Sequence, residues 1–135
     1  MHKLLEIKSF VMTRLLTLEN ENTGTVDICF DDSDVVSNND FSFMKKNESY
    51  DCKIKLFGNV VDKLNNDKST FLCTVKKHSC QIGKTNFVMI STENNDNYYI
   101  PKSIFYKRKM KNEFYFKVVR KDIIQVNENL HGDYI

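Results

Sequence analysis

The amino-acid sequence predicts a mainly β fold: one domain over residues 1–135, built as a small antiparallel barrel or sandwich with at most one or two short helices. Several segments alternate apolar and polar residues with the two-residue period of a half-buried strand. Short runs rich in Asn, Asp and Gly, which favour turns, separate these segments. The 135 residues include one Pro and four Gly and show no linker or repeat. Closing or stacking such a sheet would protect the strand edges.

Residues 3–18 admit two interpretations. Apolar side chains at helical spacing would form one stripe on a helix: Leu4, Ile7, Val11, Leu15 and Leu18. The β-favouring pieces around Phe10-Val11 and residues 15–18 instead fit a hairpin that leads into a turn at Gly24. We favour strands here; if the fold has one helix, we expect it in residues 33–44 or in this segment.

The clearest strand runs from Tyr50 to Phe57, where apolar and polar residues alternate as far as Leu56. We expect it to continue past Gly58 to Val61, because an isolated Gly within a strand often marks a bulge or a barrel bend. Residues 50–58 would then suit the long bent first strand of an OB-like barrel.

The remaining strands are shorter. We expect them at residues 71–75, 87–90, 98–100, 114–118 and 123–126. Turn-forming residues separate them at 65–67, 82–84 and 93–96.

Cysteine usage and hydropathy predict a cytoplasmic protein. Cys29, Cys52 and Cys73 lie within apolar strand-like runs, where cysteine behaves as a small buried hydrophobe. The chain shows no signal peptide and no run of about 18 apolar residues. We therefore expect four free thiols and no membrane association.

Charge is divided between two segments of a chain whose formal net charge is only +2. Every ionisable side chain from Glu19 to Asp40 is acidic, whereas eight of the nine charged residues between Lys102 and Lys121 are basic. Clustered like charge attracts partners of the opposite sign, so this asymmetry bears on binding rather than on a reaction.

The acidic segment is the first candidate binding surface. Its carboxylates and the neighbouring aromatic residues could meet a basic protein: Asp27, Asp31, Asp32, Asp34, Asp40, Phe41 and Phe43. The spacing does not match an EF-hand, so we expect no metal. A plain solvated acidic loop is the alternative interpretation.

The basic segment is the second candidate surface. Five residues would project from a turn between a strand that ends near Phe105 and one that begins near Phe114: Tyr106, Lys107, Arg108, Lys109 and Lys111. Cations that follow phosphates and aromatic faces that stack on bases are typical of single-stranded nucleic-acid binding. A solvated hairpin is the alternative interpretation.

No nucleophile motif, phosphate-binding loop or paired metal ligands occur in the sequence, so we predict no enzymatic activity and no cofactor. The lack of a catalytic motif and the concentrated acidic surface of a small domain resemble bacterial immunity proteins, small cytosolic inhibitors that neutralise toxins. This resemblance implies a non-enzymatic protein-binding module that blocks a basic toxin domain. Two alternatives are an OB-like single-stranded nucleic-acid-binding protein and a structural or assembly subunit of a phage or secretion system.

Overall fold

The computed structural model describes residues 1–36, 40–62, 68–107 and 111–135. The first half of the chain contains β1 (His2–Ser9), β2 (Arg14–Asn20), β3 (Val26–Asp31), α1 (Ser33–Val36), β4 (Ser49–Tyr50) and β5 (Cys52–Val61). The second half contains β6 (Thr70–Ile82), β7 (Thr85–Ser91), β8 (Asn97–Pro101), α2 (Lys102–Lys107), β9 (Glu113–Val126), β10 (Asn129–Leu130) and the 3₁₀ helix η1 (Gly132–Tyr134). The fold is mainly β with two short α-helices among the described residues, which confirms the predicted class.

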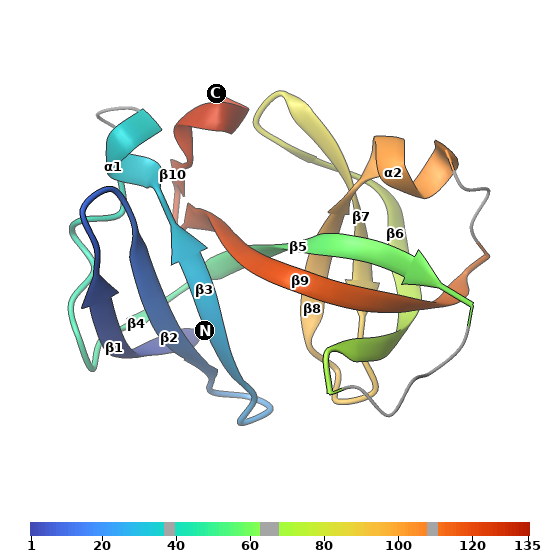
Figure 1. Cartoon of the computed structure of the whole chain (residues 1–135), viewed down its shortest axis with the longest axis horizontal. Coiled ribbons are helices and arrows are strands. Elements are labelled where there is room, and N and C mark those ends of the chain that lie inside the picture. Colours follow the sequence, from blue (N-terminus) through green and yellow to red (C-terminus); the bar gives the residue numbers. More distant parts are fainter. Residues whose placement is uncertain (37–39, 63–67, 108–110) are drawn as a thin grey trace.

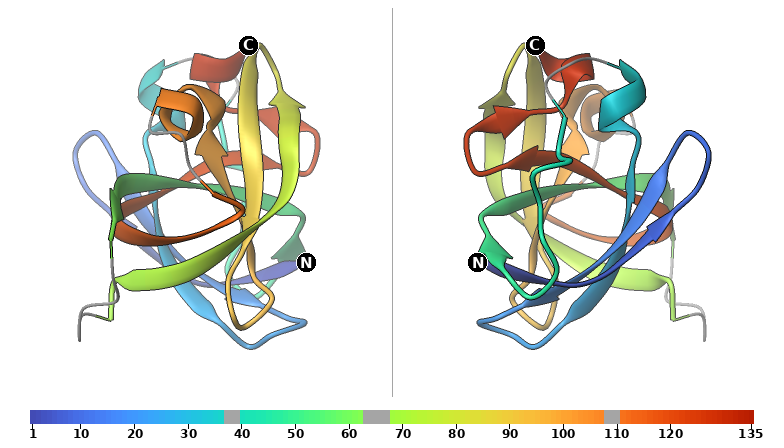
Figure 2. Two further views of the ribbon diagram at one scale, coloured as in Figure 1. Left: turned by 90° about the vertical axis from the view of Figure 1, so that its right-hand side faces the viewer. Right: turned by 90° about the vertical axis from the view of Figure 1, so that its left-hand side faces the viewer.

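Five strands close into a ring, which we call the barrel (Figure 1, right-hand part). The pairing order is β5-β8-β7-β6-β9, and β9 returns to pair with β5. Residues Thr70 to Thr74 of β6 pair with Glu113 to Lys117 of β9, and this contact closes the ring. Most pairings are antiparallel, but β5 and β8 meet in parallel at Lys55 and Tyr99. Figure 2 (left) views the molecule from the barrel side.

The other strands form a small antiparallel sheet beside the barrel, ordered β4-β1-β2-β3, which we call the wing (Figure 1, left-hand part). It joins the barrel through a parallel bridge between Phe30 of β3 and Asp122 of β9. One apolar core nevertheless spans both parts, because Leu4 and Leu16 of the wing belong to the same buried cluster as Ile54 and Val88 of the barrel.

Residues 3–18 form strands rather than a helix, as favoured. β1 and β2 pair as a hairpin, with Ser9 opposite Arg14. Leu4, Leu16 and Leu18 are completely buried, whereas Val11 lies fully exposed in the turn. Burial of every second residue on each strand therefore accounts for the positions of the apolar residues better than a single helical stripe does. The expected helix in residues 33–44 is α1.

The strand predicted past Gly58 is also confirmed. The pairing of β5 with β9 slips by one residue between Phe57 and Gly58, because Val119 of β9 has no partner on β5, so a bulge lies opposite this glycine. A Cβ atom at Gly58 would lie 2.0 Å from the carbonyl oxygen of Lys117 and 2.9 Å from the ring of Phe116. Only glycine lets β9 approach β5 this closely.

Three predicted boundaries are wrong. Residues 114–118 and 123–126 belong to the single strand β9, which stays continuous through register shifts in its pairing with β5. The strand at 71–75 extends to Ile82 because β6 pairs with β9 at its start and with β7 at its end. Phe105 lies on α2 rather than on a strand, and it is buried against His78 and Phe114. The turn expected at 65–67 lies outside the described residues.

The barrel has the strand number of an OB barrel but a different chain order. In an OB barrel, a three-stranded meander is followed by a helix and two more strands, the last of which lies parallel beside the third. Here β6, β7 and β8 form the meander and α2 follows it. The strand parallel to β8 is β5, which precedes the meander, so β6 and not residues 50–58 takes the place of the first OB strand.

Of the four cysteines, Cys29, Cys52 and Cys73 are buried as predicted, and Cys80 is half-buried. Within the ranges that the structure describes, no helix has the length and apolar character needed to cross a membrane.

Candidate partner-binding site

The alternation of β3 divides the acidic segment between two faces. Asp27, Cys29 and Asp31 point into the protein and are at most 2% exposed. Val26 and Ile28 face outward, with 50% and 61% of their surface exposed. β3 thus buries two carboxylates beside Cys29 and exposes Val26 and Ile28, which reverses the usual preference of charged side chains for the surface and apolar ones for the core.

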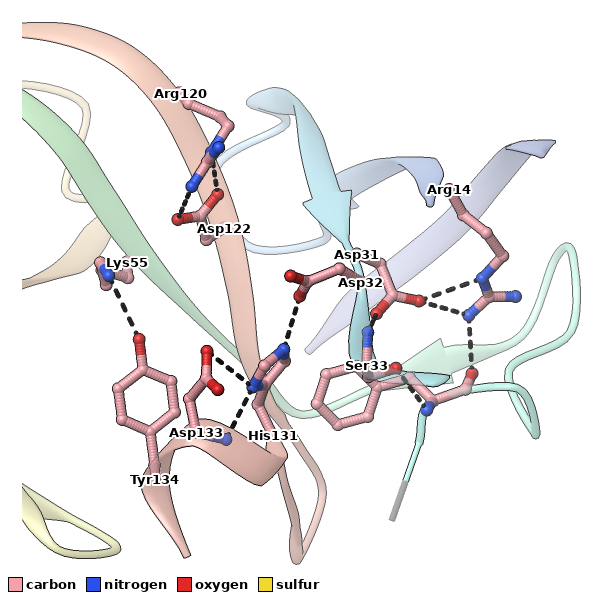
Figure 3. Close-up of polar contacts among 11 residues, drawn as sticks. Arg14, Asp31, Asp32, Ser33, Lys55, Arg120, Asp122, His131, Asp133 and Tyr134 are labelled. Carbon is pink, nitrogen blue, oxygen red and sulfur yellow. Dashed lines mark hydrogen bonds and ion pairs between the residues drawn. The ribbon is translucent and has the colours of Figure 1, made fainter. Parts of the chain in front are cut away.

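Asp31 is a structural carboxylate rather than a contact for a partner. Its Oδ2 accepts hydrogen bonds from Nε and Nη2 of Arg14 at 3.0 and 2.7 Å, and its Oδ1 accepts from the Ser33 amide at 2.9 Å (Figure 3). Arg14 also donates to the carbonyl of Phe41 at 2.9 Å. Asp31 thereby fixes the start of α1, and its predicted place on a binding face is corrected.

Phe41 is corrected in the same way, because its side chain is completely buried. Its amide donates to the Ser33 hydroxyl at 3.0 Å, which holds the returning chain against α1. Phe43 keeps 39% of its surface exposed and packs edge-on against Tyr50. Asp40 accepts hydrogen bonds from the amide and hydroxyl of its near neighbour Ser42, and these lower the pKa of its carboxyl group.

Asp27 is buried at the junction of wing and barrel, so its predicted role at the surface is also wrong. Its carboxylate accepts a hydrogen bond from the Tyr98 hydroxyl at 2.7 Å and forms an ion pair with the Lys121 ammonium group. Burial, reinforced by the charge of Asp27, raises the pKa of Tyr98, so the hydroxyl stays protonated and can donate. The Asp27, Tyr98 and Lys121 contacts connect β3 to β8 and β9.

Asp96 forms a second set of hydrogen bonds between the wing and the barrel, which the sequence did not reveal. It is buried in the turn between β7 and β8 and accepts hydrogen bonds from Asn20, Thr23 and Thr25 at 3.2, 2.5 and 2.6 Å. In the sequence it belongs to an ordinary turn-forming run, 93–96, and nothing there indicates its distant partners.

Two of the predicted carboxylates, Asp32 and Asp34, lie at the surface, and Asp133 lies near them at one end of the molecule. Asp32 and Asp34 flank the start of α1, and Asp133 lies on η1, which contacts α1 (Figures 1 and 2). The side chains of Asp32 and Asp133 are 37% and 60% exposed. Val35 and Val36 on α1 add exposed apolar area, at 50% and 40%. We call these five residues the α1–η1 surface.

His131 holds this surface in place. The imidazole is buried, and its Nε2 lies 2.6 Å from Oδ1 of Asp32 (Figure 3). Its Nδ1 accepts a hydrogen bond from the Asp133 amide at 3.1 Å, which assigns the proton to Nε2 and makes Nε2 the donor to Asp32. One side chain therefore fixes the carboxylate of Asp32 and the backbone of Asp133, which lie about a hundred residues apart in sequence.

A second cluster of charged and aromatic side chains lies next to His131 on the strands. Arg120 forms a two-pronged ion pair with Asp122, at 2.6 and 3.1 Å, and this hydrogen-bonded pairing raises the pKa of Arg120 (Figure 3). Lys55 donates to the hydroxyl of Tyr134 at 3.2 Å. The space between these groups is only about 80 Å³, so they pack as a network rather than as a ligand pocket.

The basic segment does not form the predicted hairpin. Tyr106 and Lys107 lie at the end of α2, Lys111 is exposed just before β9, and Arg108 and Lys109 lie outside the described residues. The chain turns through a helix here because Phe105 is anchored in the core. Two aromatic residues that precede this segment in the sequence and could have offered faces for base stacking, Tyr98 and Tyr99, are buried as well.

Charge is nevertheless divided unequally between the two halves of the chain. Residues 1–50, which include the wing and α1, contain nine acidic and five basic residues, whereas residues 51–135 contain nine acidic and fifteen basic residues. No group of three or more His, Cys, Asp or Glu side chains in the described ranges is placed to hold a metal ion.

No protein-family model, curated protein sequence or solved structure matches this chain. Its function has to be inferred from its own surfaces.

Proposed function

We propose that this protein is a non-enzymatic protein-binding module whose α1–η1 surface contacts a basic partner. In its most specific form, the proposal is a bacterial immunity protein that blocks a basic toxin domain. The observation that supports it is the presence of exposed carboxylates and exposed apolar side chains on one surface: Asp32, Asp34, Val35, Val36 and Asp133.

Both kinds of side chain have a role in such a contact. Exposed carboxylates steer a cationic partner and speed its approach, while desolvated apolar groups hold the complex once it forms. The hydrogen bonds of His131 fix the Asp32 carboxylate and the backbone that carries Asp133 before the partner arrives. Less side-chain freedom is then lost on binding than in a mobile loop.

A single-stranded nucleic-acid-binding role is the second candidate. The closed five-stranded barrel and the excess of basic residues in the barrel half favour it. The burial of Tyr98, Tyr99 and Phe105 weakens it, because base stacking needs exposed aromatic faces.

The test compares two triple variants of equal charge change. Asp32→Asn, Asp34→Asn and Asp133→Asn together remove the charge of the α1–η1 surface and keep the oxygen that Asp32 offers His131. Three exposed barrel carboxylates provide the matched control: Glu93→Gln, Glu113→Gln and Glu128→Gln.

The partner is taken from the neighbouring gene or captured from native lysate, and its association rate is measured at low and physiological salt. We expect association to slow about tenfold or more in the Asn variant at low salt and to change little in the control. Equal association rates for both variants would show that the α1–η1 surface does not contact the partner. Micromolar binding of single-stranded DNA or RNA near physiological salt would support the second candidate instead.

A further inference from the structure

A cleft of about 460 Å³ lies where β3 of the wing faces the barrel (Figure 1). The barrel side of the cleft is formed by the start of β6 and by the turn between β7 and β8. Small-molecule sites in proteins have volumes of about 300–1,000 Å³. This cleft is therefore large enough for a ligand, in contrast to the space of about 80 Å³ beside His131.

Hydrogen bonds hold the two sides of the cleft together. Asp96, in the turn between β7 and β8, accepts one from Thr25 at 2.6 Å. Asp27 of β3 accepts one from Tyr98 at 2.7 Å and forms an ion pair with Lys121. All five residues line the cleft. Because these contacts fix the wing against the barrel, the cleft is preformed, and little order is lost when a ligand enters it.

Two hydroxyl groups at the cleft have no hydrogen-bond partner among the described residues. Thr70 at the start of β6 is 5% exposed, and Thr92 directly after β7 is half-buried. Both residues line the cleft, and the hydroxyl oxygen of each is buried. Buried polar groups in proteins are nearly always hydrogen-bonded, and a buried group without a partner is costly. Both hydroxyls therefore retain hydrogen-bonding capacity for a group that enters the cleft.

The edge of β3 adds a backbone donor and a backbone acceptor. The Asn20 amide donates to the Thr25 carbonyl, and hydrogen-bonded pairs recur at every second residue of an antiparallel ladder. Val26, opposite Glu19 in the next pair, therefore points its amide and carbonyl away from β2. Within the described ranges no strand pairs with Val26 on that side, because β3 meets β9 only at Phe30. Since Val26 lines the cleft, both groups are available to a ligand there.

The charged residues that line the cleft disfavour an ionic ligand. In the described part of the chain they are Lys68, Lys121, Asp27, Glu93 and Asp96. Lys121 and Asp27 neutralise each other, and Asp96 is held by three hydrogen bonds. The two exposed members, Lys68 and Glu93, carry opposite charges. An anion would meet carboxylates here and a cation would meet ammonium groups, so a neutral ligand fits best.

A polyhydroxylated ligand matches the remaining groups. Each hydroxyl of such a ligand both donates and accepts, as the hydroxyls of Thr70 and Thr92 do. The apolar lining, from Val26, Phe71 and Leu72, can pack against carbon-bound hydrogens. Sugar rings combine these two properties, because their hydroxyls lie at the edge and their C–H groups form apolar faces.

We propose that the cleft between β3 and the barrel binds a small neutral saccharide. Its hydroxyls bond to the Thr70 and Thr92 side chains and to the backbone of Val26, and its ring packs on the apolar lining. This site is separate from the α1–η1 surface and does not depend on the function proposed for that surface.

The probes are glucose and galactose, each compared with its own charged derivatives. Glucosamine and galactosamine carry a cation, and glucuronate and galacturonate carry an anion. Binding is followed by NMR through the amide shifts of the folded protein. We expect at least one neutral sugar to shift the amides of Val26, Thr70 and Thr92 and to leave those of α1 and η1 unchanged. Its charged derivatives should bind about tenfold or more weakly, because an unpaired charge would lose water on entry.

Threonine-to-valine variants separate binding from folding. Thr70→Val and Thr92→Val each replace a hydroxyl by a methyl group of similar size, and each should weaken sugar binding about three- to tenfold. Neither should lower the unfolding midpoint in urea, because the hydroxyl has no partner to lose among the described residues. Thr74→Val, on β6 but outside the cleft, is the matched control and should bind normally.

Three results would overturn the proposal. The first is the absence of shifts at the cleft amides with either neutral sugar at tens of millimolar. The second is tighter binding of a charged derivative than of its neutral parent, which would mean that the cleft selects an ion. The third is an equal loss of affinity in Thr70→Val and Thr74→Val, which would place the sugar outside the cleft.

Discussion

Replacement of Lys121 by methionine should destabilise the protein strongly, because it leaves a buried carboxylate without its counter-charge. Asp27 is 2% exposed, and its two described donors are the Lys121 ammonium group and the Tyr98 hydroxyl. Removal of one partner of a buried pair costs about 3–5 kcal/mol. We expect a value near the lower limit, because the Lys121 side chain is itself 20% exposed and Tyr98 continues to donate.

Two further variants distinguish the loss of a counter-charge from a simple packing defect. Tyr98→Phe removes a hydrogen bond to a charged acceptor and should cost about 1.5–3 kcal/mol. Asp27→Asn combined with Lys121→Met removes both charges and keeps an oxygen for Tyr98. This double variant should therefore be more stable than Lys121→Met alone.

Urea unfolding followed by circular dichroism gives the free energies, with the slope of the transition as a check that each variant stays two-state. Lys76→Met on the exposed side of β6 is the control and should change stability by less than about 0.5 kcal/mol. The reasoning is refuted if Lys121→Met costs no more than this control. It is also refuted if adding Asp27→Asn makes the Lys121→Met protein less stable.

Three other predictions follow from the fold and from shifted pKa values. Gly58→Ala should cost about 1–3 kcal/mol in urea unfolding, because the new Cβ would lie 2.0 Å from a backbone carbonyl of β9. Burial raises the pKa of both Cys52 and Cys73 to about 12, so iodoacetamide at pH 8 should label Cys80 first. Burial, aided by the terminal ammonium charge, lowers the pKa of His2 below its ordinary 6.5. Its contribution to stability should therefore be complete above pH 6.5 and fall on acidification, and His2→Asn should flatten this dependence in urea unfolding.

For each of these three predictions, one result would contradict the reasoning. An unchanged unfolding midpoint for the Gly58 variant would mean that the bulge adapts to a side chain. Simultaneous labelling of all cysteines in the folded protein would contradict their burial. Parallel pH profiles for wild type and the His2 variant would remove that imidazole as the source of the acid sensitivity.

The sequence by itself determined the local structure where the alternation was regular and the turns were explicit. The strand from Cys52 through Gly58 to Val61 follows from period-two patterning and from the isolated glycine, whereas Tyr50, predicted to begin this strand, belongs to β4 and pairs with β1. The hairpin of residues 3–18 follows from β-favouring pieces that flank a turn. These features depend on backbone sterics and side-chain shape over a few residues, which the sequence states directly.

The tertiary structure alone decided which face of β3 is buried. Alternation of Val26, Asp27 and Ile28 shows that two faces differ, and the ordinary expectation buries the apolar face. Here the carboxylate is inside because Lys121 and Tyr98 meet it there, from positions 94 and 71 residues away. Burial of a charge is set by the partners that surround it, and those partners come together only when the distant strands pair.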